Sequence, residues 1–257
     1  METQLSLPPN VEFEKRVSFQ RHSAWFNPAL AECRVIIIGC GAVGSNTALL
    51  AARMGFMRFD LWDLDQVEPH NLPNQAYDVA HIGMQKVDAL RDVLTRFNPE
   101  VDVSTHAEFF TADSKIHEGG PLVVATDSFD SRRAIGTVFK LNPQIMGVFE
   151  TRLGFDYGQV NLVDNLDSSQ VDVWLSSLGN DKETPEGPCN RKICGTLVAN
   201  TVSFLVHQMC DRMIQEGAGE PWSMLDRRRT MFQFSPSLTE RSLCRATPTE
   251  EENKNEI

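Results

Sequence analysis

The chain has 257 residues, enough for one large domain or two small ones, and its 41% of hydrophobic residues can form a sizeable core. It carries 24 Lys+Arg against 35 Asp+Glu, a formal net charge of −11. Such an acidic chain is a poor general binder of nucleic acid or membrane surfaces, although Leu225–Thr230 holds three arginines in a row. We therefore expect small molecules or proteins as partners.

Short apolar runs alternate with helical patterns from residue 31 onward. The run RVIIIG at 34–39 is apolar and β-branched, which is typical of a strand buried on both faces. In residues 83–100 the apolar side chains have helical spacing, and Asn98-Pro99 ends that pattern. Strands are expected at 34–39, 57–65, 101–106, 121–128, 144–151 and 157–164, and helices at 42–54, 83–100, 131–142 and 195–214.

This alternation predicts an α/β fold over residues 31–244, with a Rossmann-like, mostly parallel sheet, helices on both faces and C-terminal strands that are partly antiparallel. The polar residues 165–190 are expected to form a long crossover loop. Residues 1–30 are expected to be an N-terminal arm, and residues 245–257 a disordered acidic tail. Since no apolar run approaches the ~18 residues that span a bilayer, and no secretory signal begins the chain, we expect a cytoplasmic protein.

A glycine loop, Gly39-Cys-Gly-Ala-Val-Gly44, joins the first strand to the first helix. Gly39 permits a tight turn, Gly41 lets a phosphate approach the backbone, and Gly44 lets helix and strand pack closely. The helix N-terminus adds free N–H groups and a partial positive charge. Asp63, which ends the second strand, can accept hydrogen bonds from both hydroxyls of a ribose. These features predict a nucleotide and suit the adenosine of NAD and of ATP equally well.

The residues after Asp63 resemble a linked motif of the ThiF/MoeB/HesA family, the ubiquitin-like-protein-activating enzymes. That motif runs acid-x-acid, Val, Asn-Leu-x-Arg-Gln and Gly-x-x-Lys. The chain carries it at Asp63, Asp65, Val67, Asn71, Leu72, Gln75, Gly83 and Lys86. Asn98-Pro99, ATDSFDSRR at 125–133 and the Gly-Gln-Val strand of 154–164 also match, so the resemblance covers roughly residues 20–215. The sequence NLPNQ at 71–75 is similar to the corresponding sequence of short bacterial and phage members of the family.

The resemblance implies ATP and Mg²⁺ as cofactors and assigns roles to the motif residues. A carboxylate attacks the α-phosphorus of ATP, so cations must neutralise two anions. Lys86 would contact phosphate, or else be a surface lysine; Asp127 would hold Mg²⁺, or else cap the next helix. Asn71 and Gln75 would position ribose and phosphate. The expected nucleotide-binding residues are Gly39, Gly41, Gly44, Asp63, Asp65, Asn71, Gln75 and Lys86.

One position departs from the family pattern. Asn74 stands where the family has an arginine expected to touch ATP phosphate. Arg21, Arg16 or a residue of a second subunit could supply that charge, or the chain belongs to a divergent branch, which we favour. Arg21 matches the family's N-terminal arginine, which often reaches the neighbour's ATP site, although a surface arginine is the alternative. The resemblance further implies a homodimer.

The expected catalytic residues are Asp127, Arg21 and Cys189. By resemblance, a cysteine near position 189 takes the activated carboxylate as a thioester or joins a sulfur relay. Arg191, Lys192 and a helix N-terminus would favour its thiolate. Cys194 is the competitor, and the absence of any catalytic thiol is the third alternative. Because the chain has no Cys-x-x-Cys pair, we expect no zinc site.

We therefore expect an adenylyltransferase that activates the C-terminal carboxylate of a small ubiquitin-like or sulfur-carrier protein as acyl-AMP, with a conjugating enzyme as a further partner. Three alternatives stay open. The acidic charge argues against the first, a tRNA-modifying dehydratase of the same family. The second, an NAD-dependent oxidoreductase, lacks a recognisable catalytic domain after residue 165. The third is a non-catalytic partner subunit, which Asn74 keeps open.

Overall fold

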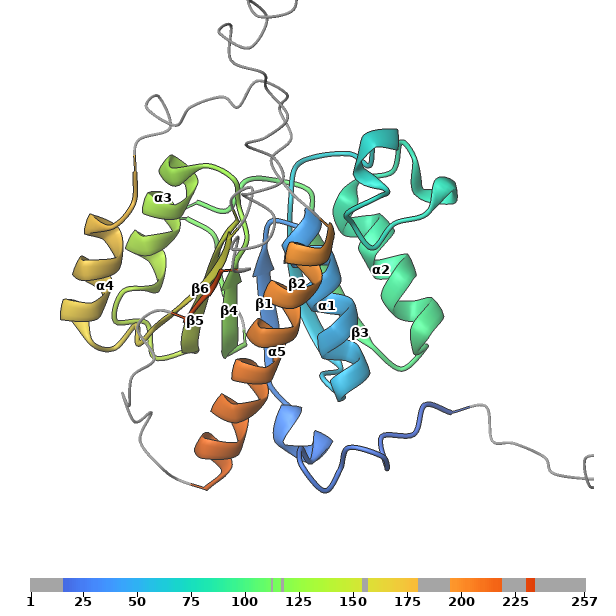
Figure 1. The fold of residues 1–257 in the computed structure, drawn as a ribbon, viewed down its shortest axis with the longest axis horizontal. Coiled ribbons are helices and arrows are strands. Elements are labelled where there is room, and N and C mark those ends of the chain that lie inside the picture. The colour runs from blue at the N-terminus through green and yellow to red at the C-terminus, as the bar shows by residue number, and fades with distance from the viewer. Residues whose placement is uncertain are drawn as a thin grey trace, which may run out of the picture.

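The computed structural model describes residues 16–111, 113–116, 118–153, 157–179, 195–218 and 230–233. In this part a seven-stranded sheet forms, with the strand order β3-β2-β1-β4-β5-β6-β7 (Figure 1). The strands are β1 (Arg34–Ile38), β2 (Arg58–Trp62), β3 (Asp102–His106), β4 (Gly120–Val124), β5 (Ile145–Leu153), β6 (Tyr157–Val163) and β7 (Thr230–Gln233). The helices are α1 (Ala42–Met54), α2 (Lys86–Phe97), α3 (Phe129–Phe139), α4 (Ser168–Ser176) and α5 (Gly195–Gly217).

The sheet is parallel from β3 to β5, and β6 and β7 are antiparallel to their neighbours. The expected fold class, a Rossmann-like and mostly parallel sheet with antiparallel C-terminal strands, is confirmed. Since β1 lies between β2 and β4, the chain order reverses at β1. Sheets of this kind bind ligands at such a reversal, beyond the carboxyl ends of the strands.

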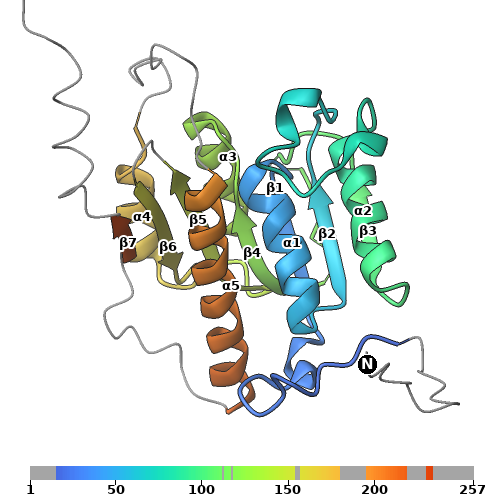
Figure 2. The ribbon, with the colours of Figure 1, turned by 45° about the vertical axis from the view of Figure 1, so that its right-hand side comes forward.

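Helices cover both faces of the sheet, with α1, α2 and α5 on one face and α3 and α4 on the other (Figures 1 and 2). Side chains of a strand point alternately to its two faces. In β1, Val35 and Ile37 accordingly join the core under α1 and α5, while Ile36 and Ile38 join the core under α3 and α4. Such a strand must be apolar throughout, which explains the unbroken run in the sequence.

The expected crossover loop at 165–190 differs from the structure, because its first part contains α4. The helix begins at its N-cap Asp167, whose side chain accepts hydrogen bonds from the backbone N–H groups of Ser169 and Gln170. Trp174 then packs on Phe139 of α3, with ring centroids 5.2 Å apart. The polar composition of the segment concealed this short amphipathic helix.

Two other segments extend the expected fold. Strand β7, which was not expected, pairs with β6. A short 3₁₀-helix, Pro28–Ala31, spans the end of the expected arm and the first residue of the expected domain, and begins at its N-cap Asn27. Residues 1–15 of the arm, residues 180–190 and the expected acidic tail lie outside the described residues. In the described part, no helix combines the length and apolar character that a bilayer crossing needs.

Candidate functional site

The glycine loop between β1 and α1 lies at the point where the chain order reverses. Gly39 has a φ of 94°, and a Cβ there would lie 2.7 Å from the carbonyl oxygen of Ala125, just after β4. A Cβ at Gly44 would overlap the carbonyl oxygen of Gly39. Gly41 is the N-cap of α1, has no side-chain cap and faces open space. The geometry therefore agrees with a tight turn at Gly39, close packing at Gly44 and room for a ligand at Gly41.

Asp63 follows β2 and its carboxylate turns back onto the glycine loop. Its Oδ2 accepts a hydrogen bond of 2.6 Å from the backbone N–H of Cys40, and its Oδ1 accepts one of 2.8 Å from that of Asp65. Burial raises the pKa of the Asp63 carboxyl, while the nearby charge of Lys86 acts in the opposite direction. A desolvated carboxyl held in a fixed orientation is typical of binding and catalytic sites.

Lys86 is the first residue of α2 and is not a solvated surface lysine. Only 10% of its side chain is exposed, and its Nζ donates to Oδ2 of Asp65 over 2.6 Å. Its backbone carbonyl and that of Cys40 both accept from the Oη of Tyr77, at 3.3 and 2.6 Å. Tyr77 thereby links the start of α2 to the glycine loop. Sequence reasoning missed it because only this tertiary contact gives the residue its role.

The segment around Asn71 and Gln75 lies against the start of α1. The backbone N–H of Ala76 donates to Oγ of Ser45, and the backbone carbonyl of Asn74 accepts from Nδ2 of Asn46. Asn71 closes a local turn, since its Oδ1 accepts from the N–H of Glu68 at 2.9 Å. The Oε1 of Gln75 is shielded from solvent and has no hydrogen-bond partner among the described residues.

Asn74, at the position of the family arginine, faces the start of α5. A Cβ placed on Gly195 would lie 3.2 Å from the Oδ1 of Asn74. The N-terminus of a helix carries a partial positive charge, which favours an amide oxygen there over a guanidinium group. The position of α5 therefore gives a physical reason for asparagine at 74.

Asp127 is exposed and lies two residues after Ala125, whose carbonyl contacts the glycine loop. The alternative role for Asp127 as a helix cap is wrong. The N-cap of α3 is Ser128, whose Oγ accepts from the backbone N–H of Ser131 at 3.2 Å. The Asp127 carboxylate is therefore not needed to begin that helix.

Arg21 belongs to the opposite end of the sheet. Its segment leads to Trp25, which stacks on His207 of α5 with ring centroids 4.8 Å apart. The segment continues to Pro28, which packs on Gly55 at the C-terminal end of α1: a Cβ added to Gly55 would lie 2.7 Å from the Pro28 side chain. The glycine loop lies at the other end of α1 (Figure 2). One chain therefore does not bring Arg21 to its own glycine loop.

The described cysteines are inert. Burial raises the pKa of Cys33 to about 11 and that of Cys210 to about 12, and it raises the pKa of Cys40 well above the ordinary value. These thiols carry almost no thiolate at neutral pH, which supports a structural role for Cys40. The candidates Cys189 and Cys194 lie outside the described residues. Among the residues that are described, no group of three or more His, Cys, Asp or Glu could hold a metal ion.

Comparison with known families matches residues 15–255 to the ThiF family. Ubiquitin-like modifier-activating enzyme 5 of Caenorhabditis briggsae is 38% identical over 199 residues, which are 67% of this chain and 46% of the relative. Adenylyltransferase and sulfurtransferase MOCS3 of Culex quinquefasciatus is 35% identical over 107 residues, or 40% of this chain and 24% of the relative. The chain thus spans at most about half the length of these curated relatives.

Solved structures share the fold. The tRNA N6-threonylcarbamoyladenosine dehydratase TcdA of E. coli superposes with a TM-score of 0.62 at 17% identity, covering 79% of this chain and 96% of TcdA. TcdA in complex with ATP gives a TM-score of 0.58 at 19% identity, over 79% of this chain and 96% of that one. MccB of E. coli with ATP gives 0.56 at 17% identity, over 80% of this chain and 67% of that one.

Proposed function

The chain belongs to the ThiF family, and from this premise we propose that it is an ATP-dependent adenylyltransferase acting on the C-terminal carboxylate of a small ubiquitin-like or sulfur-carrier protein. The carboxylate attacks the α-phosphorus of ATP, pyrophosphate leaves, and acyl-AMP forms. One observation carries the proposal: Asp63 on the glycine loop, the Lys86–Asp65 ion pair at the start of α2, and Asp127 beyond the end of β4 all lie at the reversal of strand order.

The residues around the glycine loop fit ATP. Gly41 leaves room for a phosphate at the start of α1. The Oε1 of Gln75 and the Oγ1 of Thr126 are both shielded and lack a hydrogen-bond partner among the described residues. The first can accept from a ribose hydroxyl, and the second can donate to a phosphate oxygen. Asp63, in its ionised form, can accept from the ribose hydroxyls.

Charge neutralisation is assigned to Lys86 and to an Mg²⁺ ion held by Asp127. An ammonium group has three donors, and that of Lys86 gives one to Asp65, so donors are left for phosphate oxygens. Asp127 presents an exposed carboxylate beyond β4, and Mg²⁺ typically binds one or two carboxylates together with substrate phosphates. Mg²⁺ bound there would withdraw charge from the phosphates. Mg²⁺ held by Asp127 and the ammonium group of Lys86 would then offset the negative charges that meet when the anionic carboxylate approaches.

A second step is proposed at Cys189, where the thiolate attacks the acyl-AMP carbonyl and AMP leaves, giving a thioester. The raised pKa values of Cys33, Cys40 and Cys210 make these thiols unsuitable for that step. A dithiothreitol-sensitive adduct with the carrier protein is expected to survive Cys194→Ser and to disappear in Cys189→Ser. The reverse pattern would transfer the role to Cys194, an adduct in both variants would exclude both cysteines as its site, and the absence of any such adduct in the wild-type protein would remove the thioester step.

Adenylylation of a carboxylate on a modified tRNA base is the second candidate. It is favoured by the fold likeness to TcdA, because this chain covers 96% of that enzyme but at most about half of the activating enzymes. The net charge of −11 opposes it, since phosphate backbones bind clusters of cations. Both candidates use the same nucleotide chemistry and differ in the molecule that carries the carboxylate.

ATP–pyrophosphate exchange separates these candidates. With Mg²⁺, ATP and labelled pyrophosphate, we expect exchange that requires a small carrier protein ending in Gly-Gly. Asp127→Ala should lower the rate about 100-fold or more, because Mg²⁺ would lose its protein carboxylate. Asp130→Asn, on the exposed carboxyl three positions later in α3, is the matched control and should stay close to wild type. Exchange stimulated by tRNA would favour the dehydratase, and an active Asp127→Ala variant would contradict the role of that residue.

A further inference from the structure

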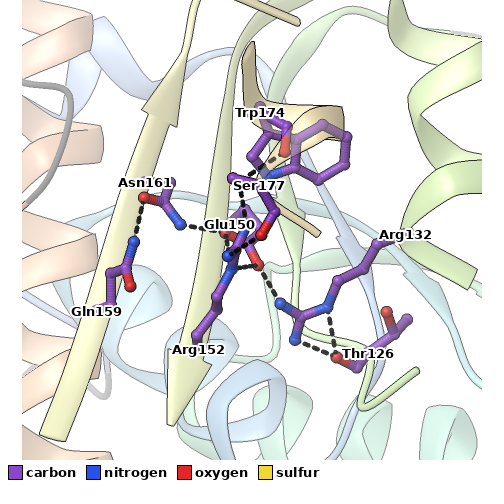
Figure 3. A network of polar contacts seen from close by, with 8 residues as sticks. All are labelled: Thr126, Arg132, Glu150, Arg152, Gln159, Asn161, Trp174 and Ser177. Atoms are coloured by element: carbon purple, nitrogen blue, oxygen red, sulfur yellow. Dashed lines mark hydrogen bonds and ion pairs between the residues drawn. The ribbon is translucent and has the colours of Figure 1, made fainter. Parts of the chain in front are cut away.

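A buried polar cluster connects β5 and β6 with α3 (Figure 3). Glu150 of β5 is completely buried, and its carboxylate accepts hydrogen bonds from Arg132 of α3, Arg152 of β5 and Asn161 of β6. Two guanidinium groups therefore share one carboxylate. Buried charges of this kind are costly unless every group is paired and hydrogen-bonded, so a buried ion cluster needs a reason beyond stability.

The cluster lies at the carboxyl edge of the sheet, beside the candidate site. Glu150 is in register with Val124, the last residue of β4, and Asp127 follows Val124 by three positions. Glu150 also faces Asn161 directly across β5 and β6. The carboxylate is thus inside the molecule, one strand away from the loop that carries Asp127.

Arg132 extends from Glu150 to that loop. Its Nη1 contacts Glu150, while its Nε and Nη2 both donate to the backbone carbonyl of Thr126, at 3.1 and 2.5 Å. This carbonyl belongs to the peptide unit that joins Thr126 to Asp127. The preceding peptide packs on the glycine loop, where a Cβ at Gly39 would lie 3.0 Å from the Thr126 nitrogen. The start of this loop is therefore held between Gly39 and a guanidinium group.

We propose that Glu150 is a positioning residue for adenylyl transfer: it orients Arg132, which fixes the Thr126 carbonyl and so sets the place of Asp127 relative to the glycine loop. The inference rests on the proposed function. A guanidinium group is planar and presents its donors in a fixed fork, so holding one edge on Glu150 aims the other edge at Thr126. Because Glu150 is fully buried, it acts through Arg132 rather than on the substrate.

The other arms of the cluster lead away from Asp127. Arg152 donates from Nη1 and Nη2 to the carbonyl oxygen and Oγ of Ser177, at 2.9 and 2.8 Å, and so ties β5 to the end of α4. Asn161 accepts from Nε2 of Gln159 at 2.6 Å. Substitutions in these arms should affect stability but not the placement of Asp127. Asn161 therefore provides a matched control that also removes one hydrogen bond from Glu150.

The test compares full-length Glu150→Ala, Arg132→Ala and Asn161→Ala in carrier-dependent exchange as a function of Mg²⁺ concentration. Because small misplacements of catalytic groups cost large factors in rate, we expect Glu150→Ala to lower kcat about tenfold or more and to raise half-saturation by Mg²⁺ about fivefold. The KM for the carrier protein should stay within about twofold. Asn161→Ala should leave kcat and Mg²⁺ half-saturation within about twofold, although its thermal stability falls.

A double variant separates positioning from general destabilisation. Glu150→Ala with Arg132→Ala should be no slower than the slower single variant, because both residues act on the same carbonyl. Glu150→Gln, which keeps an oxygen for Arg132, should recover part of the loss and provides the test if the alanine variant does not fold. Unchanged kcat and Mg²⁺ dependence per folded molecule in the Glu150 variants would overturn the inference, as would additive losses in the double variant.

Failure of the proposed function would look different. If wild-type protein shows no exchange with any carrier, the proposed function fails, and calorimetry of ATP binding then tests Glu150 without it. Glu150→Ala should weaken binding measured with Mg²⁺ about fivefold and leave binding without Mg²⁺ within about twofold. Equal effects under both conditions, or none, would overturn the positioning role.

Discussion

At the scale of single residues, Asp63 has a carboxyl group that is held in a fixed orientation and has a raised pKa. Its two oxygens accept backbone hydrogen bonds from Cys40 and Asp65, and burial raises its pKa. The folded chain therefore binds a proton more tightly than the unfolded chain. Asp63 consequently costs stability at neutral pH, and this cost disappears as the pH falls through the raised pKa toward the ordinary value.

The same shift gives nucleotide binding a pH dependence. Only the ionised carboxylate of Asp63 can accept hydrogen bonds from both ribose hydroxyls. Because the pKa of Asp63 is raised, the affinity for adenosine should already fall at a pH above the ordinary aspartate pKa of about 4. Adenosine is the probe because it carries no phosphate that would titrate as well. Calorimetry from about pH 7.5 to about pH 4.5 measures the effect. Asp63→Asn should bind weakly and show no such slope, and a flat wild-type profile would contradict the prediction.

Linear motifs can indicate residues near the glycine loop, because each motif places its residues at one strand end or one helix start. Asp63 and Lys86 are of this kind, and Asp127 follows the end of the neighbouring strand β4. Glu150 is not of this kind, because its partners come from α3 and β6 and are chosen by strand register rather than by sequence spacing. Tyr77 was also not predicted, because its role depends on tertiary contacts of its hydroxyl with the carbonyls of Cys40 and Lys86.

At the scale of elements, the glycine loop makes two substitutions behave differently. A Cβ at Gly44 would overlap the Gly39 carbonyl, so Gly44→Ala should lower the free energy of unfolding by about 3 kcal/mol. Gly41 faces open space at a negative φ, so Gly41→Ala should cost less than about 1 kcal/mol. It should nevertheless weaken ATP binding, because the new methyl group occupies the expected phosphate position. Denaturant unfolding and calorimetry measure both effects, and equal stability losses would contradict this assignment.

Elements with a strong period were predictable, and those built from tertiary contacts were not. The buried strand β1 and the helix α2 follow from apolar runs and spacing alone. Helix α4 has only Val171 and Trp174 as fully covered apolar side chains, so its pattern is too weak to recognise in a polar segment. Strand β7 is stabilised by pairing with β6, which no local pattern indicates.

At the scale of the whole molecule, the glycine loop and Arg21 lie at opposite ends of the sheet, although the family resemblance assigns both to an ATP site. The glycine loop lies at the carboxyl edge, whereas Arg21 belongs to the segment packed on the far ends of α1 and α5. If Arg21 contacts ATP, the arginine must therefore come from a second copy of the chain. In the expected homodimer, each ATP site would then be completed by the Arg21 of the other subunit.

Mixed dimers answer that question. Arg21→Ala and Asp127→Ala should each be inactive alone, yet coexpression should restore exchange, because a mixed dimer contains one site with Asp127 from one subunit and Arg21 from the other. Random pairing makes half of the dimers mixed, with one intact site of two, so about a quarter of wild-type activity is expected. Two copies that each carry both substitutions provide the inactive control. No recovery in mixtures shown to be dimeric would contradict an Arg21 acting across the interface, and the loss in Arg21→Ala would then need an origin within its own chain.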